Sequence, residues 1–275
     1  MLQEIITQLF SNDIFIGLFT GVTSVPLIAG ICWSYGRYKT RKSRAFWKPL
    51  LKQKLSVVLT EYDTFGDDLS SKTAKTAGGG FLISRGNAMA LSTLLEYIPI
   101  EVSKRSNISV IGDKSGNQNS DHLIIIGSWA NNLFAKSIFE NLIEKYDIPY
   151  DVIWDENTGA IGFKSLADDR VFMPIVKEGQ GSDYAVIIRA KYRSHPDRYV
   201  VMLAGAHMYG AQAAAMAVTN HEMLKHVKKT SHGSSDLLFL IRTSVINNSP
   251  CDPELEIGNQ VFIHDLLSSN PNPNN

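Results

Sequence analysis

Two short glycine-containing turns, each between an apolar run and a helix-like stretch, hold the groups best suited to ligand chemistry. Residues 124–132 read IIIGSWANN, and residues 202–210 read MLAGAHMYG. Glycine lets the backbone approach a ligand closely, and the N-terminus of a following helix offers unpaired N–H groups and a positive dipole to an anion. We therefore expect phosphate as the ligand group. The groups expected to bind it are Gly127, Ser128, Asn131, Gly205, His207, Tyr209 and Gly210.

Two arginines could add positive charge to such a site. Arg189 ends an apolar strand and is the better placed phosphate partner, and Arg85 is the second candidate. The alternative for both arginines is that they are solvated, which is common for this residue. The alternative for Gly127 and Gly205 is that they only permit tight turns between strand and helix. Valine in place of Gly127 or Gly205 is expected to abolish ligand binding while leaving the fold largely intact.

Catalytic and metal-binding patterns are weak in this sequence. His207, between a strand and a helix, is the candidate acid–base group if the protein is an enzyme, and capping of that helix is its alternative role; no other catalytic residue is assigned. His221 and His226 are five residues apart, about 140° around a helix, so they do not share a face as zinc ligands must. No metal is therefore expected. Neither a G-x-G-x-x-G nor a P-loop pattern follows a strand, so no specific cofactor is identified, and a nucleotide-like ligand is the one expected.

The elements that must position these groups alternate between short apolar runs and helical patterns, which is typical of an α/β fold. Only eight residues, KYRSHPDR, separate the apolar runs 184–190 and 199–203, too few for a crossover helix, so these runs predict an antiparallel hairpin. The whole predicts a Rossmann-like mixed sheet containing one hairpin. The expected strands are 56–60, 109–112, 122–126, 151–154, 161–163, 184–190, 199–203 and 237–242, and the expected helices are 87–97 with Asn87 as its cap, 132–145 and 211–227.

An uncharged run near the N-terminus predicts a membrane helix. Residues 14–36 contain no Asp, Glu, Lys or Arg and would span roughly 34 Å as a helix, against a hydrocarbon core of about 30 Å. A cleaved signal peptide is the first alternative, but it requires a positive N-terminal region and a shorter apolar core. A buried soluble helix is the second, although Pro26 and several glycines disfavour it.

A basic segment follows the apolar run and sets its orientation. Residues 37–54 carry eight of the 27 basic residues and no acid, so the positive-inside rule places the C-terminal side in the cytoplasm. The formal net charge of the chain is zero, which argues against a nucleic-acid-binding protein. The expected organisation is an extracytoplasmic N-terminus (1–13), a transmembrane helix (14–36), the basic segment (37–54), a cytoplasmic α/β domain (55–267) and a disordered tail (268–275), in the inner (cell) membrane.

The membrane segment also contains a possible self-association face. Gly17 and Gly21 form a G-x-x-x-G pair, which lets two membrane helices approach closely, so a homo-oligomer is expected to form there. Cys32 lies in the membrane segment and Cys251 near the C-terminus, so an intrachain disulfide is not expected.

The layout of a membrane helix, a basic segment and an α/β domain with glycine turns resembles membrane-anchored effectors of bacterial nucleotide-signalling defence. In these effectors a Rossmann-like sensor domain of the SLOG type recognises a nucleotide signal. The resemblance covers the layout of the whole chain and transfers no residue roles. It implies a signalling protein, in antiviral defence, that binds a nucleotide-like phosphorylated ligand. A membrane-tethered enzyme acting on a nucleotide or sugar-phosphate is the first alternative, and a ligand-free interaction scaffold is the second.

Overall fold

The computed structural model describes residues 46–47, 50, 54–60, 84–102, 108–113, 122–130, 132–156, 160–192, 195–230 and 236–256. The chain divides into two units, Met1–Lys42 and Ser43–Asn275, and every described residue belongs to the second. The expected membrane helix with Gly17 and Gly21, the tail and Asn131 lie outside the described residues. Among the helices within those ranges, none is long and apolar enough to cross a membrane.

The centre of the main sheet is parallel. Its strands β1 (Leu55–Leu59), β2 (Ile108–Gly112), β3 (His122–Ile126) and β9 (Tyr199–Gly205) lie in the order β2-β1-β3-β9. Every residue of β1 and β3 is buried, as expected for central strands covered on both faces. The continuous apolar runs that predicted these two strands thus mark the middle of the sheet.

The other half of the main sheet is antiparallel. Strand β8 (Gln180–Lys191) pairs antiparallel with β9, which confirms the predicted hairpin, and β10 (Leu237–Ile246) pairs antiparallel with β8. The mixed α/β sheet expected from the sequence is therefore present. Three short strands complete this half at β8 and β10: β7 (Ile175–Lys177), β11 (Ser249–Pro250) and β12 (Glu254–Leu255).

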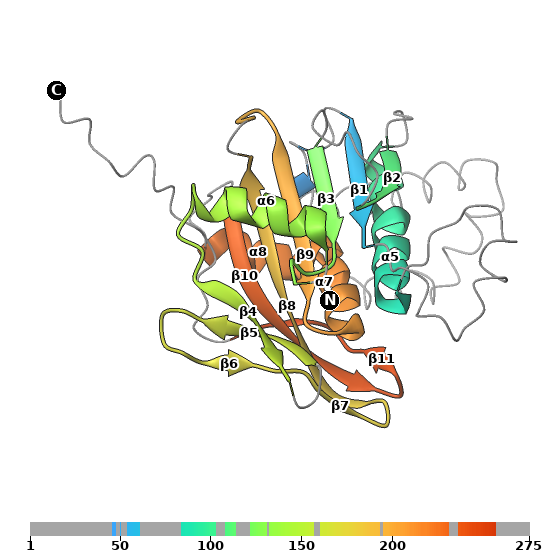
Figure 1. Cartoon of the computed structure of the whole chain (residues 1–275). Coiled ribbons are helices and arrows are strands. Elements are labelled where there is room, and N and C mark those ends of the chain that lie inside the picture. Colours follow the sequence, from blue (N-terminus) through green and yellow to red (C-terminus); the bar gives the residue numbers. More distant parts are fainter. Residues whose placement is uncertain are drawn as a thin grey trace, which may run out of the picture. The chain divides into compact units, whose positions relative to one another are not determined.

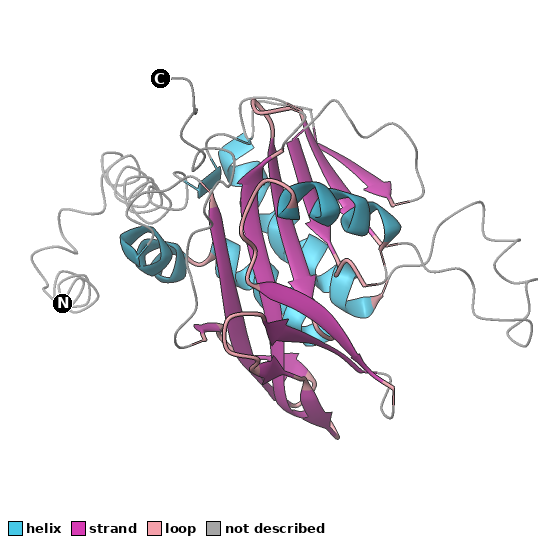
Figure 2. Cartoon of the chain, turned by 60° about the vertical axis from the view of Figure 1, so that its left-hand side comes forward, coloured by secondary structure: helices cyan, strands magenta, loops and turns pink. Residues whose placement is uncertain are grey.

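Helices cover both faces of the main sheet, as Figure 1 and Figure 2 show. On one face, α5 (Arg85–Val102), α7 (Met208–Thr219) and α8 (His221–Thr230) share an apolar core with the sheet. On the other face, α6 (Leu133–Ile143) shares a second core with the sheet and with a small antiparallel sheet. The strands of that small sheet are β4 (Tyr150–Asp155), β5 (Ala160–Ser165) and β6 (Val171–Phe172).

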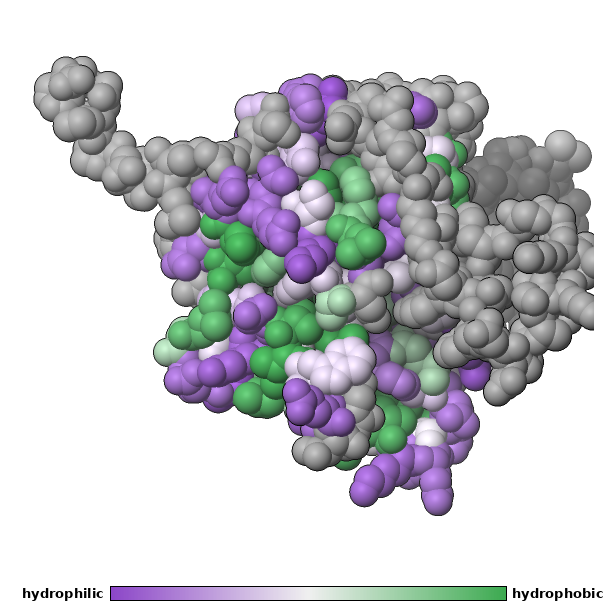
Figure 3. Space-filling model, viewed as in Figure 1, coloured by the Kyte–Doolittle hydropathy of each residue, from purple (hydrophilic) through white to green (hydrophobic). Residues whose placement is uncertain are grey.

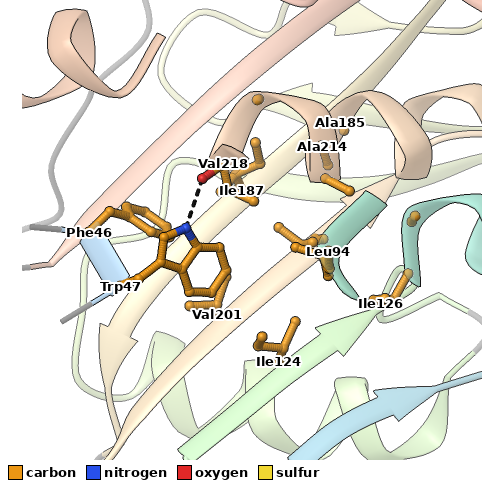
Figure 4. Close-up of a cluster of buried hydrophobic side chains, with 14 of the residues drawn as sticks. Phe46, Trp47, Leu94, Ile124, Ile126, Ala185, Ile187, Val201, Ala214 and Val218 are labelled. Atoms are coloured by element: carbon orange, nitrogen blue, oxygen red, sulfur yellow. Dashed lines mark hydrogen bonds between the residues drawn. The ribbon is translucent and has the colours of Figure 1, made fainter. Parts of the chain in front are cut away.

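The first core extends to residues that the sequence analysis placed in the basic segment. Trp47 is 1% exposed, and its indole N–H donates to the carbonyl oxygen of Val218 at 3.0 Å, as Figure 4 shows. The Phe46 ring packs edge-on against Trp47, with ring centroids 5.0 Å apart. The folded domain therefore includes apolar side chains that lie among the cations of segment 37–54.

The predicted helix 211–227 is two helices in the structure. Asn220 adopts an extended conformation, with φ −78° and ψ 121°, and separates α7 from α8. Its side-chain oxygen accepts hydrogen bonds from the backbone N–H groups of Glu222 and Met223. Asparagine is a strong N-cap residue, so the break follows from local chemistry that overrides the helical periodicity of the alanine-rich run.

Several large apolar side chains stay exposed near α6 and the small sheet. Leu133, Trp154 and Val171 are each more than half exposed. Figure 3 shows green apolar residues interspersed with purple polar ones on the face of the molecule that it presents. Apolar groups scattered in this way are ordinary on a folded surface, so they carry no functional assignment.

Candidate ligand-binding site

The two glycine turns singled out in the sequence lie side by side. Strands β3 and β9 are parallel neighbours with Ile126 opposite Leu203, and the Gly127 N–H donates to the Leu203 carbonyl oxygen at 3.1 Å. The turns 127–132 and 205–210 therefore leave the same edge of the sheet, the carboxyl edge of its parallel strands. In open α/β sheets, ligands bind outside this edge.

A polar network fixes the first turn. The Thr60 hydroxyl, just after β1, accepts from the Asn132 side-chain amide at 3.0 Å, and the Asn132 oxygen accepts the Ala135 N–H at 2.7 Å at the start of α6. Gly127 has φ +129°, and a Cβ there would overlap the Thr60 hydroxyl. The conformation and close contact of Gly127 thus have a structural cause, whatever binds nearby.

The side chains that follow Gly127 are packed into the second core. Ser128 is 3% exposed, and the Trp129 ring stacks on Phe139 at a centroid distance of 4.0 Å with the ring planes only 6° apart. Trp129 also contacts Phe163 of the small sheet, at 5.9 Å between centroids. This turn is therefore anchored by aromatic packing on its α6 side.

The second turn already holds a negative group of the protein itself. Asp183 of β8 is fully buried; one carboxylate oxygen accepts the N–H groups of His207 at 3.2 Å and Tyr184 at 2.7 Å, and the other accepts the Gly210 N–H at 2.6 Å. Burial raises the pKa of Asp183, while these N–H donors and the charge of His207 oppose that rise. The N-terminus of α7 is thus capped by an internal carboxylate.

Asp183 was not predicted to meet either turn. The available signal was a carboxylate next to the apolar run of β8, where a buried charge requires strong partners. Two of its three partners, His207 and Gly210, come from a turn more than twenty residues away, so only the folded sheet shows them.

The glycines of the second turn are required by close packing. A Cβ on Gly205 would overlap the backbone nitrogen of Ala211, and one on Gly210 would overlap the carbonyl oxygen of Tyr184. The expectation that valine at Gly127 or Gly205 would leave the fold largely intact is therefore wrong. At Gly205 a side chain would push the strand end from the start of α7, and at Gly127 it would displace the Thr60 hydroxyl and strain a backbone with φ +129°.

His207 and Tyr209 have different environments in the second turn. His207 occupies the N-cap position of α7, is exposed, and makes no capping hydrogen bond through its side chain. Tyr209 is 5% exposed, and its hydroxyl donates to the Asn248 side-chain oxygen at 3.1 Å, in the turn between β10 and β11. His207 is therefore available at the edge, whereas Tyr209 joins two parts of the fold.

Arg189 lies away from the two turns. It is opposite Val201 on β9, whereas Ala185 is opposite Gly205, so Arg189 is about 13 Å along β8 from the carboxyl edge. Its guanidinium lies over the rings of Phe46 at 5.1 Å and Tyr199 at 4.9 Å, and burial lowers its pKa. The structure does not bring this predicted phosphate partner to the site, because the antiparallel direction of β8 carries it to the other end of the sheet.

The first turn of α5 also reaches the carboxyl edge, since α5 is the helix that follows β1. The helix begins at the exposed Arg85, and Ser84 caps it by accepting the Asn87 N–H at 3.1 Å. Asn87 is thus inside the first turn rather than the cap that the sequence predicted. It is 4% exposed, and its side-chain nitrogen has no hydrogen-bond partner among the described residues.

Metal ligands and known relatives add no further assignment. The described part of the chain contains no group of three or more His, Cys, Asp or Glu residues that could hold a metal ion. Comparison with protein-family models, with curated proteins and with solved structures found no match for this chain.

Proposed function

We propose that this protein is a single-pass membrane sensor whose cytoplasmic α/β domain binds a nucleotide-like phosphorylated ligand, in signalling or defence. The observation that carries the proposal is the adjacency of the two glycine turns, which parallel pairing of β3 with β9 brings to one edge of the sheet. Helices α5, α6 and α7 each begin after a strand that ends at this edge, and none has an acidic residue in its first turn. Helix N-termini of this kind favour anions.

The arrangement of β1 and β3 also supports a ligand at this edge. These strands are parallel neighbours, yet the helix after β1 packs on one face of the sheet and the helix after β3 packs on the other. Such a switch point opens a crevice between the two connections, where doubly wound α/β proteins bind their ligands.

A sensor is favoured over an enzyme by the role of Asp183. Its carboxylate is fully buried, and two of the three backbone N–H groups that it accepts, those of His207 and Gly210, belong to the α7 terminus, so the side chain is committed there. The alternative enzyme would use His207 as its acid–base group, because that side chain is exposed at the same edge.

Ligand binding and ligand recovery test these readings. The full chain in detergent would be heated with ADP, ADP-ribose, cyclic dinucleotides and inorganic pyrophosphate, and each ligand would then be recovered and identified. A raised melting temperature with intact ligand supports a sensor, and converted ligand supports the enzyme. No shift across the panel would contradict both and favour the scaffold. At 100 times its dissociation constant a ligand adds about 2.7 kcal/mol of stability.

The proposal includes the membrane segment and its self-association. Gly17 and Gly21 are the proposed contact between membrane helices of two copies. Leucine at both positions should reduce crosslinked dimer in membranes without changing ligand binding by the α/β domain. Unchanged crosslinking would remove the glycine pair from the proposal.

A further inference from the structure

Asn87 carries a buried side-chain amide that is not satisfied by the part of the chain that the structure describes. The residue is 4% exposed, and its Nδ2 has no hydrogen-bond partner there. A buried donor without an acceptor costs free energy, so native proteins rarely keep one without a reason. An acceptor supplied by a bound ligand is one such reason.

The position of Asn87 on α5 directs it toward the carboxyl edge. Helical spacing places Asn87, Leu94 and Ile98 on one side of α5, and the latter two are buried in the first core. Figure 4 shows Leu94 in the cluster that contains Ile126, the last residue of β3.

The direction in which α5 runs determines at which end of that cluster Asn87 lies. Helix α5 connects the parallel strands β1 and β2, so it runs back against them. Asn87 precedes Leu94 by seven residues, about 10 Å along the helix. The Asn87 amide is therefore at the end of the core nearest the carboxyl edge of β1 and β3, at the switch point between them.

The first turn of α5 is positive in the part of the chain that the structure describes. Arg85 opens the helix, no acidic residue lies in its first turn, and the helix is 18 residues long. The first turn of α7 is close by, since a Cβ on Gly86 would be 2.6 Å from the Met208 Cα. That neighbouring terminus is occupied by Asp183, whereas the α5 terminus has an arginine and an amide donor that no described residue accepts.

We infer that a phosphate group of the ligand binds at the first turn of α5, where the Asn87 side-chain amide donates to a phosphate oxygen and Arg85 adds charge. This inference rests on the proposed function. It places the phosphate at the switch point between β1 and β3 rather than at the α7 turn. An oxygen acceptor satisfies the buried donor, and a negative charge matches the helix terminus.

The test compares Asn87→Leu with the unmodified full chain in detergent, using inorganic pyrophosphate and ADP as probes. Asn141→Leu is the matched control, because Asn141 is a helical asparagine on α6 whose amide donates to the Ser137 carbonyl oxygen, at the exposed surface. Melting temperature is measured without probe, and the dissociation constant is measured by titration calorimetry. We expect Asn87→Leu to melt at or above the temperature of the unmodified protein and to bind the probes at least tenfold more weakly. The control should bind them unchanged.

Each other outcome has a separate meaning. Equal binding by Asn87→Leu and the unmodified protein would overturn this inference and leave the proposed function standing. A melting temperature several degrees lower for Asn87→Leu without probe would show that the amide has a structural partner, which also overturns it. If the unmodified protein binds neither these probes nor the wider nucleotide panel, the proposed function fails and this inference fails with it.

Discussion

The N-termini of α5 and α7 are close to each other at one edge of the sheet, but different groups of the protein surround them. At α7, the Asp183 carboxylate accepts the backbone N–H groups of His207 and Gly210, with a pKa raised by burial. At α5, the first turn contains Arg85, no acidic residue, and the buried Asn87 amide, whose nitrogen has no partner within the described ranges. The first terminus is completed by the fold, and the second has the chemistry of a site completed by a ligand.

The difference shows why glycine turns alone are weak evidence for a phosphate site. A helix N-terminus attracts any anion, and a carboxylate of the same chain is always present at high local concentration. Stability should therefore depend on the α7 terminus, and binding should depend on the α5 terminus.

Removing the internal anion should have the largest effect. Asp183→Ala leaves the N–H groups of His207 and Gly210 at the start of α7, and that of Tyr184 in β8, without their acceptor. We therefore expect a loss of about 3 kcal/mol or more in the free energy of unfolding. Urea unfolding followed by circular dichroism measures it. The control Asp168→Ala, at an exposed turn, should unfold like the unmodified protein. Equal stability of both variants would mean that α7 does not need its carboxylate.

A methyl group in the second turn should have the next largest effect. In Gly205→Ala, the added Cβ meets the backbone of Ala211 at the first turn of α7, so strand and helix must separate. We expect about 2 kcal/mol of destabilisation in urea unfolding, because overpacking of rigid backbone typically costs that much. Stability equal to that of the unmodified protein would show that the turn can relax, and would reopen a ligand role for Gly205.

Acidity should act on the α7 terminus, where burial raises the pKa of the Asp183 carboxyl. Because the folded-state pKa of Asp183 is raised, the folded protein binds more protons than the unfolded chain above about pH 4. This contribution to the free energy of unfolding is present below that pH and is lost as pH rises through the raised pKa. The measurement is the free energy of unfolding of the unmodified protein minus that of Asp183→Asn, at a series of pH values from about 4 upward. The difference should fall with rising pH, and an increase would mean that the pKa is lowered.

The smallest effect is expected at Tyr209, which attaches the start of α7 to the turn between β10 and β11. Tyr209→Phe removes one hydrogen bond to Asn248 and keeps the buried ring, so we expect about 1 kcal/mol of destabilisation by thermal unfolding. Binding of the phosphate probes should not change. Weaker probe binding at equal stability would place the hydroxyl in the ligand site.

Local patterns predicted the strands and the hairpin well because these features depend on neighbours in the chain. The run 122–126 matches β3 at both ends, since a buried central strand is apolar throughout. The expected strands 151–154 and 161–163 also exist, but they form a separate small sheet with β6. Nothing local distinguishes a strand of that sheet from one of the main sheet.

The site was less predictable because its contacts join distant segments. Asp183 meets the α7 terminus only through the pairing of β8 with β9, and Arg189 is carried away from the turns by the direction of the same strand. Asn87 was predicted as a helix cap because the two preceding residues of α5 were not recognised. A residue's type indicates which chemistry it can do, but sheet topology decides which partners it meets.

The hydrogen bond from Trp47 to Val218 has a consequence for how the protein is made. The two residues are 171 positions apart, and at about 5–20 residues per second a ribosome needs roughly 10–30 seconds to travel from one to the other. During that interval the Trp47 indole has no acceptor on α7, because that helix has not yet been made. Trp47 itself follows shortly after the segment expected to enter the membrane. The core around Trp47 can therefore close only late in synthesis, after α7 has been made.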